Sequence, residues 1–296
     1  MTALAELLVN GLASGAVYAL VALGFVIVHR STEVINFAHP SLLLAGGYLV
    51  AVLHDDIGFW PALGAGVAGA AALGALVEFV VLRRLRSGSH GTLSIVTIGV
   101  DIVLTVEIAR RIGAEVLPLG DPWGDRVVQV GGVTIAQARI AALGVAVAAI
   151  TVFLLAFKYT SWGVAMRAAA EDRATAALMG VRLGRVSAGA WAVAGALAAL
   201  AALFLCVFPT PGLDRATSFA ALKALPAAVI GGVDSTTGAL AGGLLIGVTE
   251  ALAVGYQDEA ALLRGGFADI APYLLMIVVL LIRPTGLFGT RELARA

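Results

Sequence analysis

The chain is organised around long runs of apolar residues with few or no charged side chains. Residues 7–28 contain no Asp, Glu, Lys or Arg, and comparable runs recur along the rest of the chain. A helix needs about 20 apolar residues to cross the hydrocarbon core of a bilayer. Charged residues make up only 13% of the chain, against about 25% in soluble domains. Too little polar surface remains to cover such a chain in water, so we expect the bilayer to be its solvent.

The pattern of these runs predicts an all-α, polytopic transmembrane helix bundle with about eight full spans and one short, broken segment. The predicted full spans are residues 7–28, 35–53, 57–82, 92–108, 140–157, 186–208, 237–255 and 270–282. Residues 219–233 are too short to cross comfortably and are interrupted by Pro226, Gly231 and Gly232. Such a break is tolerated only where protein buries the freed backbone groups. No linker separates the runs, so we expect residues 1–296 to form a single domain.

Loops rich in arginine and lysine alternate with loops that lack them. The loops 83–90 and 158–185 and the C-terminal tail are basic, whereas residues 256–260 are acidic. Cytoplasmic loops carry the excess of Lys and Arg, so we expect the basic loops and the C-terminus inside and the N-terminus outside. The arginine pair at 110–111 opposes this assignment, because it falls on the outer side. Residues 115–135 combine Gly/Pro turns with β-branched alternation and predict a small external hairpin.

Small residues recur at steps of four in three of the runs. The sets are Gly11 and Gly15; Gly66, Ala70 and Gly74; and Gly243 and Gly247. Small residues at this spacing let membrane helices approach closely where lipid supplies no hydrophobic drive for association. We therefore expect these faces to lie at helix–helix contacts in a compact bundle.

Polar side chains lie inside two of the predicted spans. Ser94, Thr97, Asp101 and Thr105 share one face of a helix, because their steps are three, four and four residues. An ionisable group in mid-span usually faces the bundle interior or a wet cavity. Two interpretations have equal weight: a stripe that lines a solute path, or a structural hydrogen-bond network. The candidate path residues are Asn36, His39, Ser94, Thr97 and Asp101.

Patterns typical of enzymes and of metal or nucleic-acid binding are missing from the sequence. No Ser/His/Asp arrangement or pair of catalytic carboxylates stands out, and no His or Cys residues have metal-ligand spacing. The chain contains no Gly-Lys dipeptide and hence no Walker A loop. Its net charge of zero gives no global attraction to nucleic acid. We expect no catalytic residue, metal or cofactor in this chain, so any ATP must bind elsewhere.

The segment 161–186 is charged and rich in alanine, although it lies between two apolar runs. Its pattern predicts a helix that ends at Gly180, a residue type suited to a helix C-terminus. Arg167 and Glu171 are spaced i, i+4 on that helix, and Asp172 and Arg173 extend the charged surface. Such a long helical connector favours docking of a partner. The alternative is a solvated loop helix whose charges only fix the topology.

Several ordered motifs resemble the permeases of branched-chain amino acid ABC transporters, of the LivH type. "MRAAAEDRATAALMGVRLGRV" resembles their cytoplasmic coupling segment, and "LVNGLASGAVYALVALGFVIV" their first helix. "VINFAHPSLLLAGGYLV" resembles their second helix, and "LKALPAAVIGGVDSTTGALAGGLLIGVTEAL" their late Gly-rich hairpin. "LLIRPTGLFG" resembles their C-terminal signature. The likeness extends over nearly the whole chain.

The resemblance implies a multi-pass protein of the bacterial cytoplasmic (inner) membrane that works as one subunit of an importer. It implies a second permease, homologous or identical, two cytosolic ABC ATPases that bind ATP-Mg, and an extracytoplasmic solute-binding protein. It also implies that Arg167, Glu171, Asp172, Arg173 and Gly180 belong to a segment that docks on the ATPases. One departure stands out, because the family usually has Gly and then an acidic residue after "INFAH". This chain has Pro40 and Ser41 there, and Pro40 would bend the second span.

The expected function is uptake of branched-chain or other small neutral amino acids by ATP-driven alternating access, with urea and short amides as alternative cargo. One rival is an ion-coupled secondary transporter, which Asp101 and the broken segment would suit. The second rival is a membrane enzyme using Asp101, Glu78 or His39, which no convergent catalytic set supports.

Overall fold

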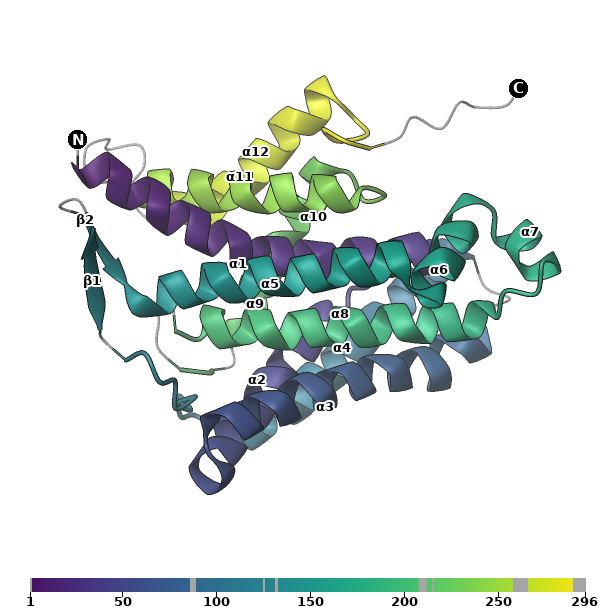
Figure 1. The fold of residues 1–296 in the computed structure, drawn as a ribbon, viewed down its shortest axis with the longest axis horizontal. Helices are drawn as coiled ribbons and strands as arrows, with labels where there is room; N and C mark the ends of the chain where they lie inside the picture. The colour runs from purple at the N-terminus through teal and green to yellow at the C-terminus, as the bar shows by residue number, and fades with distance from the viewer. Residues whose placement is uncertain are drawn as a thin grey trace. The chain divides into compact units, whose positions relative to one another are not determined.

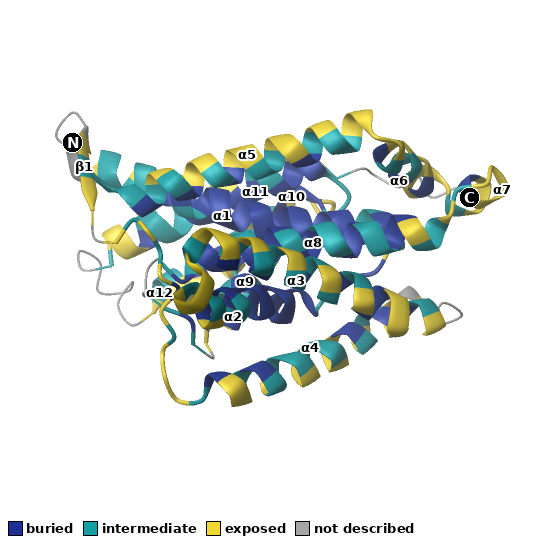
Figure 2. Ribbon diagram, turned by 60° about the horizontal axis from the view of Figure 1, so that its bottom comes forward, coloured by how far each residue is buried: buried dark blue, intermediate teal, exposed yellow. Residues whose placement is uncertain are grey.

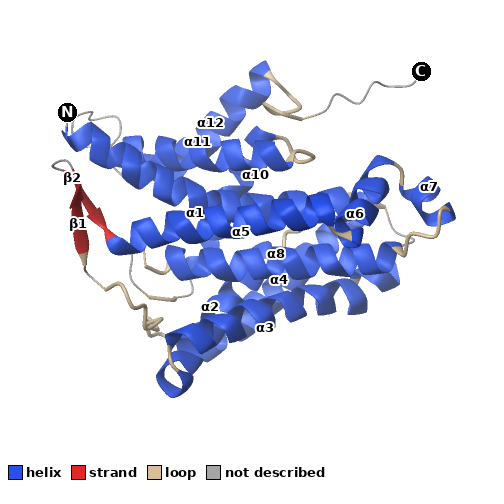
Figure 3. Cartoon of the chain, viewed as in Figure 1, coloured by secondary structure: helices blue, strands red, loops and turns tan. Residues whose placement is uncertain are grey.

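The computed structural model describes residues 2–85, 89–124, 126–130, 133–207, 212–214, 216–257 and 266–289. Helices make up most of this part of the chain, and one two-stranded hairpin supplies its strands (Figure 3). The predicted all-α, polytopic fold is therefore confirmed.

The helices follow the order of the predicted apolar runs (Figure 1). The described elements are α1 (Thr2–Thr32), α2 (His39–Ile57), α3 (Phe59–Val80), the 3₁₀ turn η1 (Leu82–Leu85), α4 (His90–Ile112), β1 (Val127–Val130), β2 (Val133–Ala136), α5 (Gln137–Tyr159), α6 (Ser161–Glu171), α7 (Arg173–Leu178), α8 (Leu183–Leu205), α9 (Thr217–Leu222), α10 (Ala224–Gly231), α11 (Thr236–Gly255) and α12 (Phe267–Ile282).

The chain divides into two compact units. Unit 1 comprises Met1–Val26, Trp123–Ala146 and Leu222–Ala296, and unit 2 comprises Ile27–Pro122 and Val147–Ala221. The boundaries at 26–27 and 146–147 fall inside α1 and α5, so each of these helices contributes residues to both units.

Unit 2 is built around α2, α3 and α8, which pack on one another through small residues. A Cβ atom added to Gly66 of α3 would lie 2.6 Å from Cγ2 of Val50 and 2.7 Å from the carbonyl oxygen of Gly46, both in α2. Gly74 of α3 comes equally close to the carbonyl group of Trp191 in α8. The predicted close-packing face of α3 is therefore confirmed, with α2 and α8 as its partners.

Unit 1 contains a second close contact, between the first part of α1 and α11. A Cβ atom on Gly15 would lie 2.8 Å from the Cα of Leu244, and one on Gly243 would lie 2.5 Å from the Cα of Ala19. Gly11 and Gly247 lie along the same contact. The expectation that these glycines lie at a helix–helix contact is confirmed. In the same unit, α11 packs against α10 and α12.

Six helical stretches in the described part of the chain are long and apolar enough to cross a membrane. They are Leu4–Thr32, Phe59–Leu85, Gly91–Ile112, Gln137–Tyr159, Leu183–Leu205 and Thr236–Gly255. Thr217–Gly231 and Phe267–Ile282 are apolar but shorter. The expected count of about eight full spans is thus not confirmed.

Exposed residues repeat along α4 and α5 (Figure 2), and many of them are apolar, such as Ile95, Val103 and Val152.

The predicted interruption within residues 219–233 is present, but it lies at Lys223 and not at Pro226. α9 ends at Leu222 and α10 begins at Ala224, so Lys223 separates the two short helices. Pro226 lies inside α10 and has no N–H group to donate to the preceding turn. α10 ends before Gly232, whose φ of 104° is in the left-handed region that glycine adopts without a steric penalty.

The predicted hairpin is also present. Strands β1 and β2 are antiparallel, with Val127 opposite Ala136 and Val130 opposite Val133. Its location outside the membrane stays a prediction.

Candidate functional site

The 161–186 segment forms two helices instead of the single predicted one. α6 ends at Glu171, and Asp172 takes an extended conformation with φ −154° and ψ 106°. Oδ1 of Asp172 accepts hydrogen bonds from the backbone N–H groups of Ala174 at 2.9 Å and Thr175 at 3.0 Å. Asp172 is thus the N-cap of α7. Sequence spacing missed the interruption because alanine favours helix on both sides of it.

Gly180 ends the second helix, as predicted. Its φ is 86°, and its N–H group donates to the carbonyl of Ala177 at 3.0 Å. The N–H group of Val181 reaches back to the carbonyl of Ala176, also at 3.0 Å. This pair of bonds is a Schellman motif, in which glycine provides the left-handed residue.

Arg167 faces the membrane helices and not its sequence neighbour Glu171. Its guanidinium group donates to the carbonyl oxygen of Phe157 and, at 3.3 Å, to that of Lys158, in the last turn of α5. It also lies over the Phe157 ring, 5.2 Å from the centroid. Arg30 of α1 lies over the same ring at 5.5 Å. Cations are favourable at a helix C-terminus because its carbonyl groups carry partial negative charge.

Arg173 makes a similar contact with a second long helix. Its guanidinium group donates to the carbonyl oxygen of Ser31 in the last turn of α1. Arg167 and Arg173 therefore join the short helices to the C-terminal ends of α5 and α1. Neither contact could be predicted from the sequence, because both partners are backbone carbonyl groups.

The opposite surface of the two helices is open and partly apolar. Glu171 and Asp172 are exposed. Leu178 is 88% exposed and Met179 81% exposed, which is unusual for neighbouring large apolar side chains outside a membrane span. The charges of this segment stand out in the sequence, whereas this apolar tip does not, because Leu178 and Met179 fit an ordinary helical pattern.

The N-cap of α7 predicts a pH dependence. The Thr175 hydroxyl, with the amides of Thr175 and Ala174, lowers the pKa of Asp172 below its ordinary value of 3.8. A carboxylate whose folded-state pKa is depressed stabilises the helix above its unfolded pKa, and this stabilisation is lost as pH falls through the folded value. Between pH 5 and pH 3, hydrogen-exchange protection factors in α7 should fall several-fold. Asp172→Asn can still cap the helix but cannot titrate, so an equal fall in that variant would contradict this account.

The polar stripe of α4 binds the backbone of the connection between α1 and α2. Oγ of Ser94 accepts from the N–H group of Ile35 at 3.2 Å, and Oγ1 of Thr97 accepts from that of Phe37 at 2.9 Å. The Thr97 hydroxyl donates to the carbonyl of Ser94 at 2.6 Å. Ile35 and Phe37, in the non-helical connection before α2, are thus held by side chains one helical turn apart.

Asp101 continues this pattern at the start of α2. Its Oδ1 accepts from the N–H group of Ser41 at 3.0 Å. The second span was predicted to begin at residue 35, but α2 begins at His39. Pro40 therefore lies in the first helical turn, where it needs no N–H partner. The expected bend at Pro40 is wrong, because proline starts this helix and does not interrupt it.

Asn36 and His39 are both fully buried beside the stripe. Oδ1 of Asn36 accepts from the N–H group of Ala38 at 2.9 Å and closes a local turn before α2. The Nδ2 atom of Asn36 is buried and has no hydrogen-bond partner among the described residues. The structure thus brings the candidate path residues Asn36, His39, Ser94, Thr97 and Asp101 together around one connection. In the described part of the chain, no group of three or more His, Cys, Asp or Glu side chains could hold a metal ion.

These contacts predict that Asp101 acts through hydrogen bonding and not through its charge. Asp101→Asn keeps an oxygen acceptor for the Ser41 amide, so transport and stability should stay near wild type. Asp101→Ala leaves a buried N–H group unpaired and should lower the free energy of unfolding by about 1–3 kcal/mol. Thermal melting in detergent and a transport assay check both variants. The matched control is Thr105→Val, since the buried Thr105 hydroxyl has no partner among the described residues. Loss of transport in a well-folded Asp101→Asn protein would support ion coupling instead.

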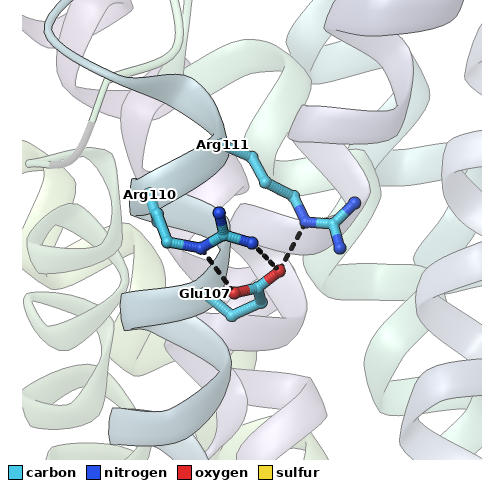
Figure 4. Close-up of polar contacts among 3 residues, drawn as sticks. All are labelled: Glu107, Arg110 and Arg111. Carbon is cyan, nitrogen blue, oxygen red and sulfur yellow. Dashed lines mark hydrogen bonds and ion pairs between the residues drawn. The ribbon is translucent and has the colours of Figure 1, made fainter.

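The arginine pair that opposed the predicted orientation is partly neutralised. Glu107 accepts from Nε and Nη2 of Arg110, both at 2.9 Å, and from Nε of Arg111 at 2.7 Å (Figure 4). One carboxylate therefore binds both arginines at this end of α4. Both arginines still count against the predicted orientation, because the positive-inside rule counts Lys and Arg and Asp or Glu contribute little to it.

A second ionic group, missed by sequence reasoning, lies in unit 1. Nζ of Lys223, between α9 and α10, is 2.8 Å from Oε1 of Glu250 in α11 and 2.8 Å from Oδ1 of Asp269 in α12. The Tyr18 hydroxyl of α1 donates to Oε2 of Glu250. These residues are far apart in the sequence. The available signs were Lys223, a lysine inside an apolar segment, and Glu250, an ionisable residue inside a predicted span.

Comparison with known proteins agrees with the resemblance. The family model for "Branched-chain amino acid transport system / permease component" matches residues 7–282. The chain is 32% identical to the "High-affinity branched-chain amino acid transport system permease protein LivH" of Escherichia coli K12, over 97% of this chain and 96% of the relative. It is equally similar, over the same shares, to the corresponding permease protein BraD of Pseudomonas aeruginosa.

A more distant relative is the "Probable branched-chain amino acid transport permease protein LivH" of Methanocaldococcus jannaschii, 28% identical over 91% of this chain and 88% of that protein. No solved structure matches the chain. The matches extend through the apolar helices, the 161–186 segment and the Gly-rich region of α10 and α11. The chain therefore belongs to the family of permease components of branched-chain amino acid transport systems.

Proposed function

We propose that this chain is the membrane-spanning subunit of an ABC importer that moves branched-chain or other small neutral amino acids into the cell. The observation that carries the proposal is the full-length match to permeases of such systems, combined with a segment at 161–186 that is joined to the ends of long helices. As a permease subunit in the cytoplasmic membrane, the chain provides the path, while partner chains bind and hydrolyse ATP.

Residues 1–296 form one transmembrane domain in this proposal. The boundaries between its compact units fall inside α1 and α5, so neither unit could be removed without cutting a helix. The full topology has about eight crossings, with α2 and α12 added to the six longer helices. The α9–α10 segment is then the short, broken element.

The 161–186 segment is the coupling segment, and its two surfaces have different tasks. Glu171, Asp172, Leu178 and Met179 face outward, where an ATPase could bind them. Arg167 and Arg173 bind carbonyl groups of α5 and α1, so movement of the segment pulls directly on those helices. Arg167 and Arg173 therefore position the segment, and Gly180 fixes the turn after α7.

The solute path includes the connection at residues 35–41 and the polar stripe of α4. Ser94 and Thr97 hold the non-helical backbone of this connection, and Asp101 holds the first turn of α2. Non-helical backbone inside a membrane protein is tolerated where protein or a cavity surrounds it. Nδ2 of Asn36 has no hydrogen-bond partner among the described residues, so its N–H groups remain for a passing solute. His39 completes the buried wall.

Such an importer requires the chains that the family implies. They are a second permease, homologous or identical to this one, two cytosolic ATPases carrying ATP-Mg, and an extracytoplasmic solute-binding protein. The binding protein selects the solute with high affinity, and a path that binds weakly lets the solute leave on the inner side.

Reconstitution tests this function. Proteoliposomes containing the chain, a partner permease and the ATPases should accumulate L-leucine only when ATP and the loaded binding protein are both present. Uptake of urea or acetamide in place of leucine would assign the alternative cargo. Uptake by this chain alone, driven by an ion gradient, would instead identify a secondary transporter.

A further inference from the structure

We propose that Lys223, Glu250 and Asp269 form a subsite for the zwitterionic α-carbon group of an amino acid, with Lys223 binding the carboxylate and Asp269 the ammonium. The inference rests on the proposed function, which supplies the class of solute. All three residues, and Tyr18, lie within unit 1, so the site is complete inside one compact part of the chain.

The arrangement brings opposite charges to one point. The Lys223 ammonium lies 2.8 Å from a carboxylate oxygen on each of two helices, α11 and α12. The Tyr18 hydroxyl donates to the second oxygen of Glu250 and holds that carboxylate in place. Glu250 is therefore fixed from two sides, whereas Lys223 is the described contact of the Asp269 carboxylate.

The charges do not balance within the cluster. One ammonium group faces two carboxylates, which leaves one negative charge without a counterion among these residues. The side chain of Asp269 is 70% exposed, whereas those of Glu250 and Lys223 are 17% and 24% exposed. The surplus charge thus lies at the open side of the cluster, where a solute ammonium group can reach it.

An amino acid matches both signs of this site. Its carboxylate can replace Asp269 at the Lys223 ammonium, while its own ammonium group pairs with the released Asp269. The exchange keeps each charge paired, so the solute enters without leaving a charged group unpaired at low dielectric. The pairing also sits at the break between α9 and α10, and transporters commonly bind solutes at discontinuous helices.

A purely structural ion network would behave differently. It would fasten the break to α11 and α12, and removing any member would loosen the fold without regard to the solute. The two roles are separated by solutes that carry only one of the two charges.

The test measures binding to the full-length chain in detergent by saturation-transfer NMR. The probes are L-leucine, isopentylamine, which lacks the carboxylate, and 4-methylpentanoate, which lacks the ammonium group. Lys223→Gln should weaken the binding of leucine and 4-methylpentanoate at least about tenfold and should not weaken that of isopentylamine. Asp269→Asn should weaken the binding of leucine and isopentylamine and should not weaken that of 4-methylpentanoate.

The chain offers matched controls. Lys158→Gln removes the other lysine, and Asp56→Asn removes an exposed carboxylate from α2. Neither should alter the binding of any probe. If Lys223→Gln does not fold, the Asp269→Asn variant alone decides, through the difference between its binding of isopentylamine and of 4-methylpentanoate. The Asp269 side chain is mostly exposed, so this variant should fold.

Equal weakening of all three probes, or no effect in either variant, would overturn the subsite, as would absence of leucine binding to the wild-type chain. Those results would leave leucine uptake by the assembled transporter intact. Failure of the assembled wild-type transporter to take up leucine would instead overturn the proposed function.

Discussion

Replacing Leu178 and Met179 together by aspartate is expected to abolish association of the permease with its ATPases while the membrane helices remain folded. These side chains are 88% and 81% exposed, so the substitutions break no internal contact of the segment. Burial of a large apolar side chain stabilises a contact by about 1.5–3 kcal/mol. Loss of both apolar side chains, with two negative charges in their place, should weaken binding of the ATPases to the permease at least about 100-fold.

Co-purification of tagged ATPases with the permease from detergent extracts measures this effect. The informative comparison is Arg167→Gln with Arg173→Gln, which changes the inward contacts and leaves the tip intact. That double variant should keep the ATPases bound but lose ATP-driven uptake. The reason is that the segment has lost the side-chain contacts of Arg167 and Arg173 with the ends of α5 and α1. Undiminished co-purification of the Leu178→Asp, Met179→Asp protein would show that the apolar tip is not the docking surface.

Gly243→Leu is expected to prevent formation of the folded permease. A Cβ atom at this position would lie 2.5 Å from both the Cα and the backbone nitrogen of Ala19 in α1. Backbone atoms cannot move aside as a flexible side chain can, so α1 and α11 would have to separate. Forcing atoms into such a contact should destabilise the protein by about 3 kcal/mol or more.

The matched control is Gly99→Leu, in a helix where an added Cβ atom meets nothing within 4 Å. The melting temperature of this variant should equal or exceed that of the wild-type protein, because leucine favours helix more than glycine does. Monodisperse yield and thermal melting in detergent distinguish the two proteins. Similar melting temperatures for Gly243→Leu and Gly99→Leu would contradict the close packing of α1 on α11.

Much of the fold could be predicted because the bilayer imposes simple rules. The uncharged runs predicted the long helices. Small residues spaced four positions apart predicted the helix–helix contacts at Gly66 and Gly243. The hairpin before α5 and the end of α10 before Gly232 followed from local residue chemistry, whereas the break between α9 and α10 lies at Lys223 and not at the predicted Pro226. The start of α2 was predicted too early, at residue 35 instead of His39. Hydropathy does not distinguish a non-helical apolar connection from the helix that follows it.

The candidate site was predicted in its residues but not in its geometry. The spacing of Ser94, Thr97 and Asp101 placed them on one face, yet it did not reveal that backbone amides would occupy their oxygens. Arg167 was expected beside Glu171, although its partners are carbonyl groups of α5. Such contacts depend on tertiary packing, and backbone acceptors leave no pattern in a sequence.

Single-cysteine labelling determines whether the proposed coupling segment, residues 161–186, protrudes into the cytosol. The native Cys206 is buried at 2% exposure, so it gives little background. In a permease expressed without its ATPases, which would cover Leu178, Leu178→Cys should react with a membrane-impermeant maleimide in inverted vesicles and not in intact spheroplasts, whereas Val127→Cys, in the hairpin, should show the reverse. Labelling of Leu178→Cys from outside the cell would contradict the account.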